Sequence, residues 1–164
     1  MLPLIEAQLV TITGLSTHRV FSRLAGRQVT THPQQGTQYI VIRPRVPSPI
    51  EGPVSSAGRV QGMKRRVLEV VCRTRLGMDT VDRDDNFLLR ADDGHFALED
   101  AVYDALEIFE PTDSTGNVLS AEPMRSLPDD GESQKSEPLD PQWGESVLLF
   151  EVKYLQALDQ SRQS

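Results

Sequence analysis

The pattern of hydrophobic positions predicts a short helix over residues 3–13. Ile5, Leu9 and Ile12 recur at helical spacing. Pro3 suits the first turn, where the N–H that proline lacks has no helical partner. A helix of this length is marginal by itself, so we expect it to pack against the rest of the fold.

A second helical pattern follows Asp92-Asp93-Gly94 and continues to Phe109. Either aspartate can cap the first N–H groups, and its charge suits the positive end of the helix dipole. One face of this helix is apolar and is predicted to join the core, through Leu98, Val102, Ala105, Leu106 and Phe109. The opposite face is predicted to be acidic, with Glu99, Asp100, Asp104 and Glu107.

Three segments have the composition and period of strands: residues 38–43, 64–76 and 143–155. In the second strand, alternate residues form an apolar face predicted to lie in the core, with Leu68, Val70 and Cys72. Its other face is half-polar, as expected of an antiparallel sheet with one hydrated side. In the third strand the predicted core face holds Leu148, Phe150, Val152 and Tyr154.

The remaining segments are predicted to be mostly loops. Residues 47–63 are rich in proline and glycine, and residues 110–142 contain a polar stretch that cannot bury enough apolar surface to order itself. A short strand could lie at 118–124, and residues 18–21 fit either a helix or an extended segment. The prediction is a single α+β domain over residues 1–164, with a mostly antiparallel sheet and both helices on one face.

The charge distribution changes this picture more than the composition does. Residues 1–82 carry a net charge of +6 and residues 83–164 a net charge of −13, for a total of −7. This balance disfavours general nucleic-acid binding, and the asymmetry is typical of an electrostatic interface. No apolar run is long enough for a membrane span, and no signal peptide is expected. We therefore expect a protein made in the cytoplasm.

The residues that could carry chemistry do not form a recognisable catalytic pattern. Cys72 lies on an apolar strand face, where a thiol behaves as a small hydrophobic group. Asp82 and Asp84 fit positions of a calcium loop, but Phe87 stands where the sharp turn needs glycine. We therefore predict no enzyme, no metal and no cofactor. Were the chain an enzyme, Asp82, Asp84 and His95 would be the residues to test.

The candidate interface combines basic and acidic residues. Arg59, Lys64, Arg65 and Arg66 form the predicted basic patch. It could contact phosphates, but pairing with the acidic half of a neighbouring copy is the favoured interpretation, because the complementary charge lies in the same chain. The acidic side of that contact is predicted at Asp82, Asp84 and Asp85.

After the first predicted helix, the chain turns into GLSTHRVF at 14–21 and passes through the link HPQQG at 32–36. The strand YIVIR at 39–43 follows, and later come the helix ALEDAVYDAL at 97–106 and the final strand LLFEVKY at 148–154. This order of segments resembles the tail terminator (tail completion) proteins of long-tailed bacteriophages.

This resemblance implies a virion protein of the tail and neck. Six copies would form a ring on the head-proximal end of the tail tube, stop tube polymerisation and dock the head connector. The hairpin loop would reach a neighbouring copy or the tube protein, and DNA would pass through without sequence-specific contact. The alternatives are another neck or head-completion protein, a sheath-end protein of a contractile tail, or a cellular acidic adaptor that binds a basic partner.

Overall fold

The fold is seen in a computed structural model that describes residues 1–13, 15, 20–22, 38–46, 48–49, 54–56, 59–75, 94–131 and 143–157. The described elements lie along the chain in the following order: α1 (Leu2–Val10), β1 (Val20–Ser22), β2 (Gln38–Pro44), β3 (Ser48–Pro49), β4 (Val54–Ser56), β5 (Arg59–Arg75), α3 (His95–Leu106), β6 (Arg125–Leu127) and β7 (Trp143–Ala157). The predicted α+β class is confirmed.

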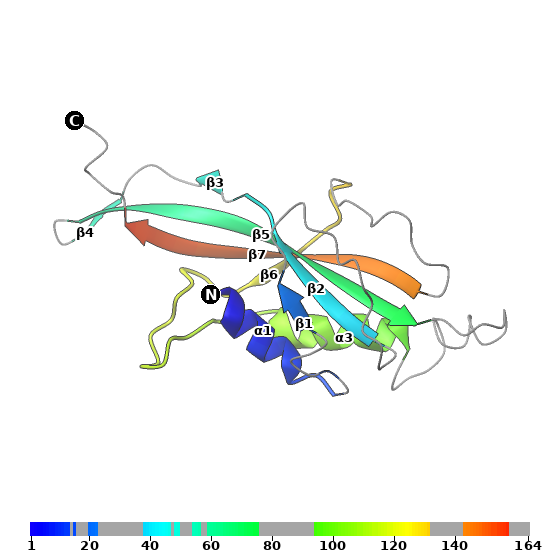
Figure 1. The fold of residues 1–164 in the computed structure, drawn as a ribbon. Helices are drawn as coiled ribbons and strands as arrows, with labels where there is room; N and C mark the ends of the chain where they lie inside the picture. The colour runs from blue at the N-terminus through cyan, green and yellow to red at the C-terminus, as the bar shows by residue number, and fades with distance from the viewer. Residues whose placement is uncertain are drawn as a thin grey trace.

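The described strands form one sheet in the order β1-β2-β5-β7-β6, with β3 and β4 also pairing with β5. Only β1 runs parallel to its neighbour, and the other pairings are antiparallel. Both helices cover the same face of the sheet (Figure 1). The prediction of a mostly antiparallel sheet with two helices on one face is therefore confirmed.

The core lies between this face and the helices. Most of the residues predicted for the core are buried there: Leu68, Val70, Cys72, Leu98, Val102, Leu106, Leu148, Phe150 and Val152. Ala105, Phe109 and Tyr154 are only partly buried against the cluster, and Phe109 lies beyond the end of α3 at Leu106. The alternation of side chains in β5 and β7 thus identified the inner face correctly.

The helix boundaries differ from the prediction at both C-terminal ends. α1 ends at Val10 rather than residue 13. Gly94 is the N-cap of α3, and Asp92 and Asp93, the predicted capping residues, lie outside the described residues. At the other end the chain leaves the helix because Glu107 is extended, with ψ 128°, and Ile108 has φ 59°.

The two predicted loops contain strands. Residues 48–49, 54–56 and 59–63 belong to β3, β4 and the first part of β5, inside the segment predicted as a loop. Within residues 110–142 the strand is β6, at Arg125–Leu127, and not at 118–124. Strand pairing with β5 and β7 supplies hydrogen bonds that outweigh the local preference of a proline- and glycine-rich segment.

The second face of the sheet is less hydrated than predicted. Val71 is fully buried in a small cluster with Tyr39 and Val41, and Glu69 and Arg73 are only 7% and 4% exposed. The charged residues in this face are therefore held in hydrogen-bonded pairs, as the cost of burying a lone charge requires.

Candidate functional site

The longest feature of the fold is an arm made from β5 and β7, with β4 paired to its outer end. β5 has 17 residues and α3 has 12. At ~3.3 Å per strand residue and ~1.5 Å per helical residue, the strand is about 56 Å long and the helix about 18 Å. One end of the sheet therefore extends well beyond the helices (Figure 1).

One edge of this arm, the edge of β7 that faces away from β5, has a strand partner over only a short stretch among the described residues. There β6 pairs with β7 from Leu149 to Glu151. Beyond this ladder, the backbone hydrogen bond from Ala121 N–H to the Lys153 carbonyl, at 2.7 Å, ties the adjoining loop to the strand. An exposed strand edge is a natural template for pairing with another chain.

The predicted basic patch lies on β5, where strand alternation divides it. Lys64 and Arg66 point to one face and Arg65 to the other, so the three do not form one surface. Arg65 forms an ion pair with Glu151 of β7. Arg59 begins β5, and its side chain lies outside the described part.

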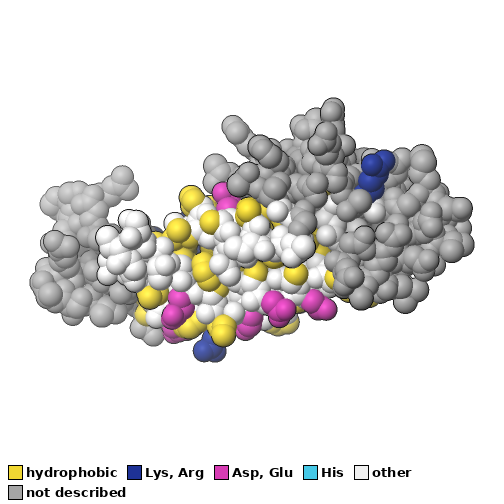
Figure 2. Space-filling view, turned by 90° about the horizontal axis from the view of Figure 1, so that it is seen from below, with side chains coloured by type: hydrophobic (Ala, Val, Ile, Leu, Met, Phe, Trp, Pro, Cys, Tyr) yellow, Lys and Arg dark blue, Asp and Glu magenta, His cyan; other side chains and the backbone are white. Residues whose placement is uncertain are grey.

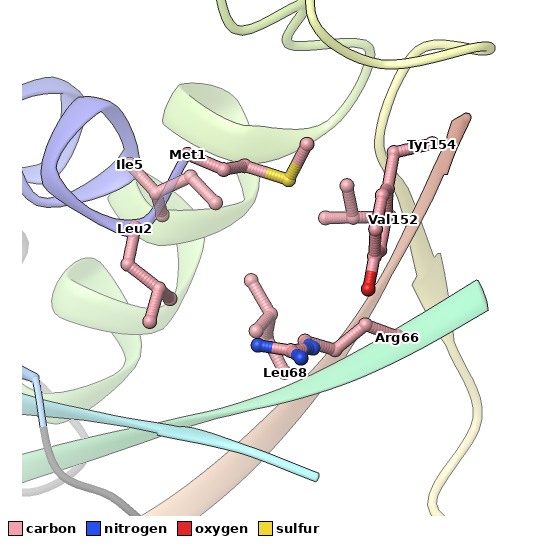
Figure 3. Close-up of a pocket in the computed structure, with 7 residues that line it drawn as sticks. All are labelled: Met1, Leu2, Ile5, Arg66, Leu68, Val152 and Tyr154. Atoms are coloured by element: carbon pink, nitrogen blue, oxygen red, sulfur yellow. The ribbon is translucent and has the colours of Figure 1, made fainter. Parts of the chain in front are cut away.

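Arg66 lies on the same face as Leu68, at the point where the arm leaves the helices. It lines a pocket of about 190 Å³ whose other walls come from both sheet and helix: Met1, Leu2, Ile5, Leu68, Val152 and Tyr154. Figure 3 shows the guanidinium of Arg66 reaching from β5 toward the α1 side. The Arg66 Nε is buried and donates no hydrogen bond within the described structure.

This pocket was missed by the sequence analysis, although part of the signal was there. Arg66 has the same parity as the buried positions Leu68 and Val70, so alternation alone places it on the inner face. The patch interpretation grouped it with its neighbour Arg65 because the two are adjacent in sequence. The contribution of α1 to the pocket depends on tertiary packing.

The acidic residues proposed to meet the basic patch, Asp82, Asp84 and Asp85, lie outside the described residues, as does the calcium-loop pattern. Further along the chain, Asp130 contacts Arg45 through two hydrogen bonds of 2.5 and 3.1 Å. Arg45 also donates to Glu69 at 2.8 Å. This acidic residue is therefore engaged within its own chain, on the second face of the sheet.

A second charged group on that face is more deeply buried. Arg73 Nε lies 2.6 Å from Glu145 Oε2, and its guanidinium also donates to the Tyr39 hydroxyl at 2.6 Å. The guanidinium carbon lies 5.4 Å from the centre of the Tyr39 ring. Burial raises the pKa of Tyr39 above its ordinary value, against the opposing effect of Arg73.

His95 is the most chemically suggestive buried residue. Its Nδ1 lies 2.9 Å from Thr74 Oγ1, and its Nε2 lies 2.9 Å from Ser146 Oγ and 3.3 Å from Glu99 Oε1. The hydrogen bond from His95 lowers the pKa of Glu99. Glu99 was predicted on the outer acidic face of the helix, and this contact corrects that assignment.

The arrangement around His95 is buried, whereas a catalytic triad must reach its substrate. In a triad the hydroxyl and the carboxylate occupy opposite ring nitrogens. Thr74 on Nδ1 and Glu99 on Nε2 have this arrangement, but Thr74 is only 2% exposed and His95 is fully buried. Ser146 shares Nε2 with Glu99. The carboxylate only accepts hydrogen bonds, so it favours a proton on that nitrogen. The geometry fits a buried polar network that joins α3 to β5 and β7.

The described residues also give little support for a reactive thiol, a metal site or a membrane-spanning helix. Cys72 is a free, buried thiol whose pKa is raised by burial, which disfavours the reactive thiolate. No group of three or more potential metal ligands occurs in the described part of the chain. No helix there has the length and apolar composition needed to cross a membrane.

Neither family models nor curated proteins match the sequence. Function is therefore inferred from two features of the described structure, the arm and the pocket at its base.

Proposed function

We propose that this chain is a structural virion protein rather than an enzyme. In this proposal it forms a ring, most simply of six copies, at the head-proximal end of the tail tube of a long-tailed bacteriophage. The ring ends polymerisation of the tube protein and joins the tail to the head connector or neck protein. DNA passes through the ring without sequence-specific binding.

The observation that carries the proposal is the β arm. The resemblance to tail terminators leads us to expect a sheet with helices on one face and a hairpin that reaches a neighbour. The described structure has this layering, and β5 extends far past α3 (Figure 1). A long ribbon without a helical layer has backbone edges and side chains that suit contact with another chain.

The charge of the helical face is consistent with such an assembly. Figure 2 shows hydrophobic side chains across this face and acidic side chains along one edge. Asp100 and Asp104 of α3 are exposed. Negative surface charge repels DNA phosphates, so a protein with a net charge of −7 can surround passing DNA without holding it.

Negative-stain microscopy of the purified protein, at low and high concentration and with or without tail tubes, tests the proposal. We expect rings with a central hole and caps on one end of the tubes. Lys64→Glu changes a charge on the arm, and Arg75→Glu makes the same change at the other end of β5 as a control. The arm variant should lose rings while the control keeps them.

Two results would count against the proposal. A protein that stays monomeric at every concentration and ignores tubes cannot be a terminator. Tight one-to-one binding to a basic protein, without rings, would instead support the acidic adaptor, whose contact surface would be the acidic edge of α3.

A further inference from the structure

The pocket at the base of the arm contains unfilled space and a polar group that has no hydrogen-bond partner among the described residues. Its walls are mainly aliphatic, from α1, β5 and β7, yet it contains the guanidinium of Arg66 with a buried Nε–H that has no acceptor in the described structure. An apolar cavity of roughly 150 Å³ can hold a benzene-sized molecule. A pocket of about 190 Å³ therefore accepts one branched aliphatic side chain. An occupant that also brings a carboxylate would complement the arginine.

A second feature of the same chain is a large apolar side chain that is exposed rather than packed. Ile108, two residues after the end of α3, is 75% exposed and has φ 59°. Left-handed backbone is rare and strained for a β-branched residue. Two backbone hydrogen bonds maintain it, from Ile108 N–H to the Met124 carbonyl and from Met124 N–H to the Phe109 carbonyl, both at 2.9 Å. The structure thus holds a large apolar side chain outward at a conformational cost.

Ile108 begins a loop that is ordered by its own contacts, which we call the 108–119 loop. The Asp113 carboxylate accepts hydrogen bonds from the backbone N–H groups of Thr115 and Asn117, at 2.8 and 2.9 Å. The Leu119 N–H donates to the Pro111 carbonyl at 2.8 Å, and closes the base of the loop. A surface that is already ordered loses little entropy when it binds.

The 108–119 loop combines apolar and acidic groups. Val118 and Leu119 are 49% and 38% exposed, in addition to Ile108. Glu110 is exposed and makes no ion pair with the described residues. This loop therefore supplies both groups that the pocket lacks: an aliphatic side chain and a carboxylate two residues away from it.

We propose that the Arg66 pocket receives the 108–119 loop of a second copy of this chain, with Ile108 in the apolar part and Glu110 facing Arg66. The inference rests on the proposed ring, because it specifies the contact between neighbouring copies. The two surfaces are different patches of one molecule, so the contact is heterologous. Such a contact gives a ring when the rotation between copies closes, as the proposed function requires, and an open filament when it does not.

The test uses one variant of each surface in the full chain. Ile108→Asn removes the apolar side chain and substitutes a residue that tolerates left-handed backbone, so the fold should be no less stable. Arg66→Glu reverses the charge in the pocket, and Arg66→Met removes it while keeping an unbranched apolar stem. Arg75→Glu, exposed at the far end of β5, is the matched charge control. Thermal unfolding establishes that each variant folds.

Self-association is then measured by sedimentation. We expect Ile108→Asn and Arg66→Glu to weaken it by about tenfold or more, the loss of one good contact, with a smaller loss for Arg66→Met and none for Arg75→Glu. An equimolar mixture of Ile108→Asn and Arg66→Glu should form a one-to-one dimer that grows no further. In each pair, the intact loop of the Arg66→Glu copy can enter the intact pocket of the Ile108→Asn copy. The two surfaces that remain are both altered, so no third copy can bind.

The outcomes separate this interface from the proposed function. Normal rings from both variants would overturn the interface and leave the ring function standing. Intact rings that no longer cap tubes when Arg66 is changed would assign the pocket to the tube protein and overturn the second-copy proposal. Failure of the mixture to dimerise would also overturn it. A wild-type chain that neither assembles nor binds tubes would remove both proposals together.

Discussion

The buried pair between Arg73 and Glu145 gives the sharpest test of the second face of the sheet. Their side chains are only 5% and 2% exposed, and Arg73 also donates to the Tyr39 hydroxyl. Arg73→Met keeps most of the apolar stem and removes the charge. The carboxylate of Glu145 then stays buried without its guanidinium.

The expected cost follows from this burial. Removing one partner of a buried ion pair typically destabilises a protein by about 3–5 kcal/mol, because the remaining buried charge loses the attraction of that partner. For a chain of this length, each kcal/mol corresponds to a change in Tm of about 2–4 °C. Arg73→Met should therefore lower Tm by roughly 6–20 °C, as the product of these ranges.

Urea unfolding followed by circular dichroism measures the free energy of unfolding, and an unchanged slope shows that the unfolded state is comparable. The double variant Arg73→Met/Glu145→Met removes both charges at similar volume. It should lie within about 2 kcal/mol of the wild type, much closer than either single variant. A single-variant cost below about 1 kcal/mol, or a double-variant cost equal to the sum of the two, would refute the buried pair.

The remaining predictions concern the core, the helix and the arm. Val102→Asp places a charge at a fully buried core position and should cost several kcal/mol, enough to unfold much of the protein in a thermal scan; a native-like melting curve would contradict the packing of α3. The hydrogen bond from His95 holds the pKa of Glu99 below its usual value of 4.5, so its contribution to stability is complete above that pH and is lost as the pH falls through the folded pKa. Glu99→Gln should therefore reduce the stability difference between neutral pH and acid in urea titrations, and an unchanged pH dependence would show that this carboxylate is not involved. Arg65→Glu faces Glu151 with a like charge; because Arg65 is 40% exposed, the urea midpoint should fall by an amount equivalent to only about 1 kcal/mol. A much larger loss would show that Arg65 is needed for the fold, and that assembly defects in this variant do not report on an interface.

The sequence alone predicted the elements that have a clear period. Leu68, Val70 and Cys72 alternate along β5, and Leu98 and Val102 recur along α3, and all of them lie in the core. Periodicity is informative here because each element has one face against the core and its residues report that face directly. The class and layering of the fold follow from these patterns.

The sequence could not predict the contacts that join distant segments. β5 begins at Arg59 rather than at residue 64 because its first residues pair with β4, and from Gln61, opposite Ala157, they also pair with the end of β7. Glycine and proline in this region indicate a loop locally, and only the partner strand shows that it is part of the arm. The left-handed backbone of Ile108 likewise depends on its hydrogen bond to Met124.

The candidate site shows the same division. Sequence determined that this chain has a basic first half and an acidic second half, and it located the arginines of β5. Tertiary structure decided their roles: Arg65 pairs with Glu151, while Arg66 lines a pocket completed by α1. The physical reason is that adjacent strand residues point to opposite faces, and the surroundings of each face come from segments far away in the chain.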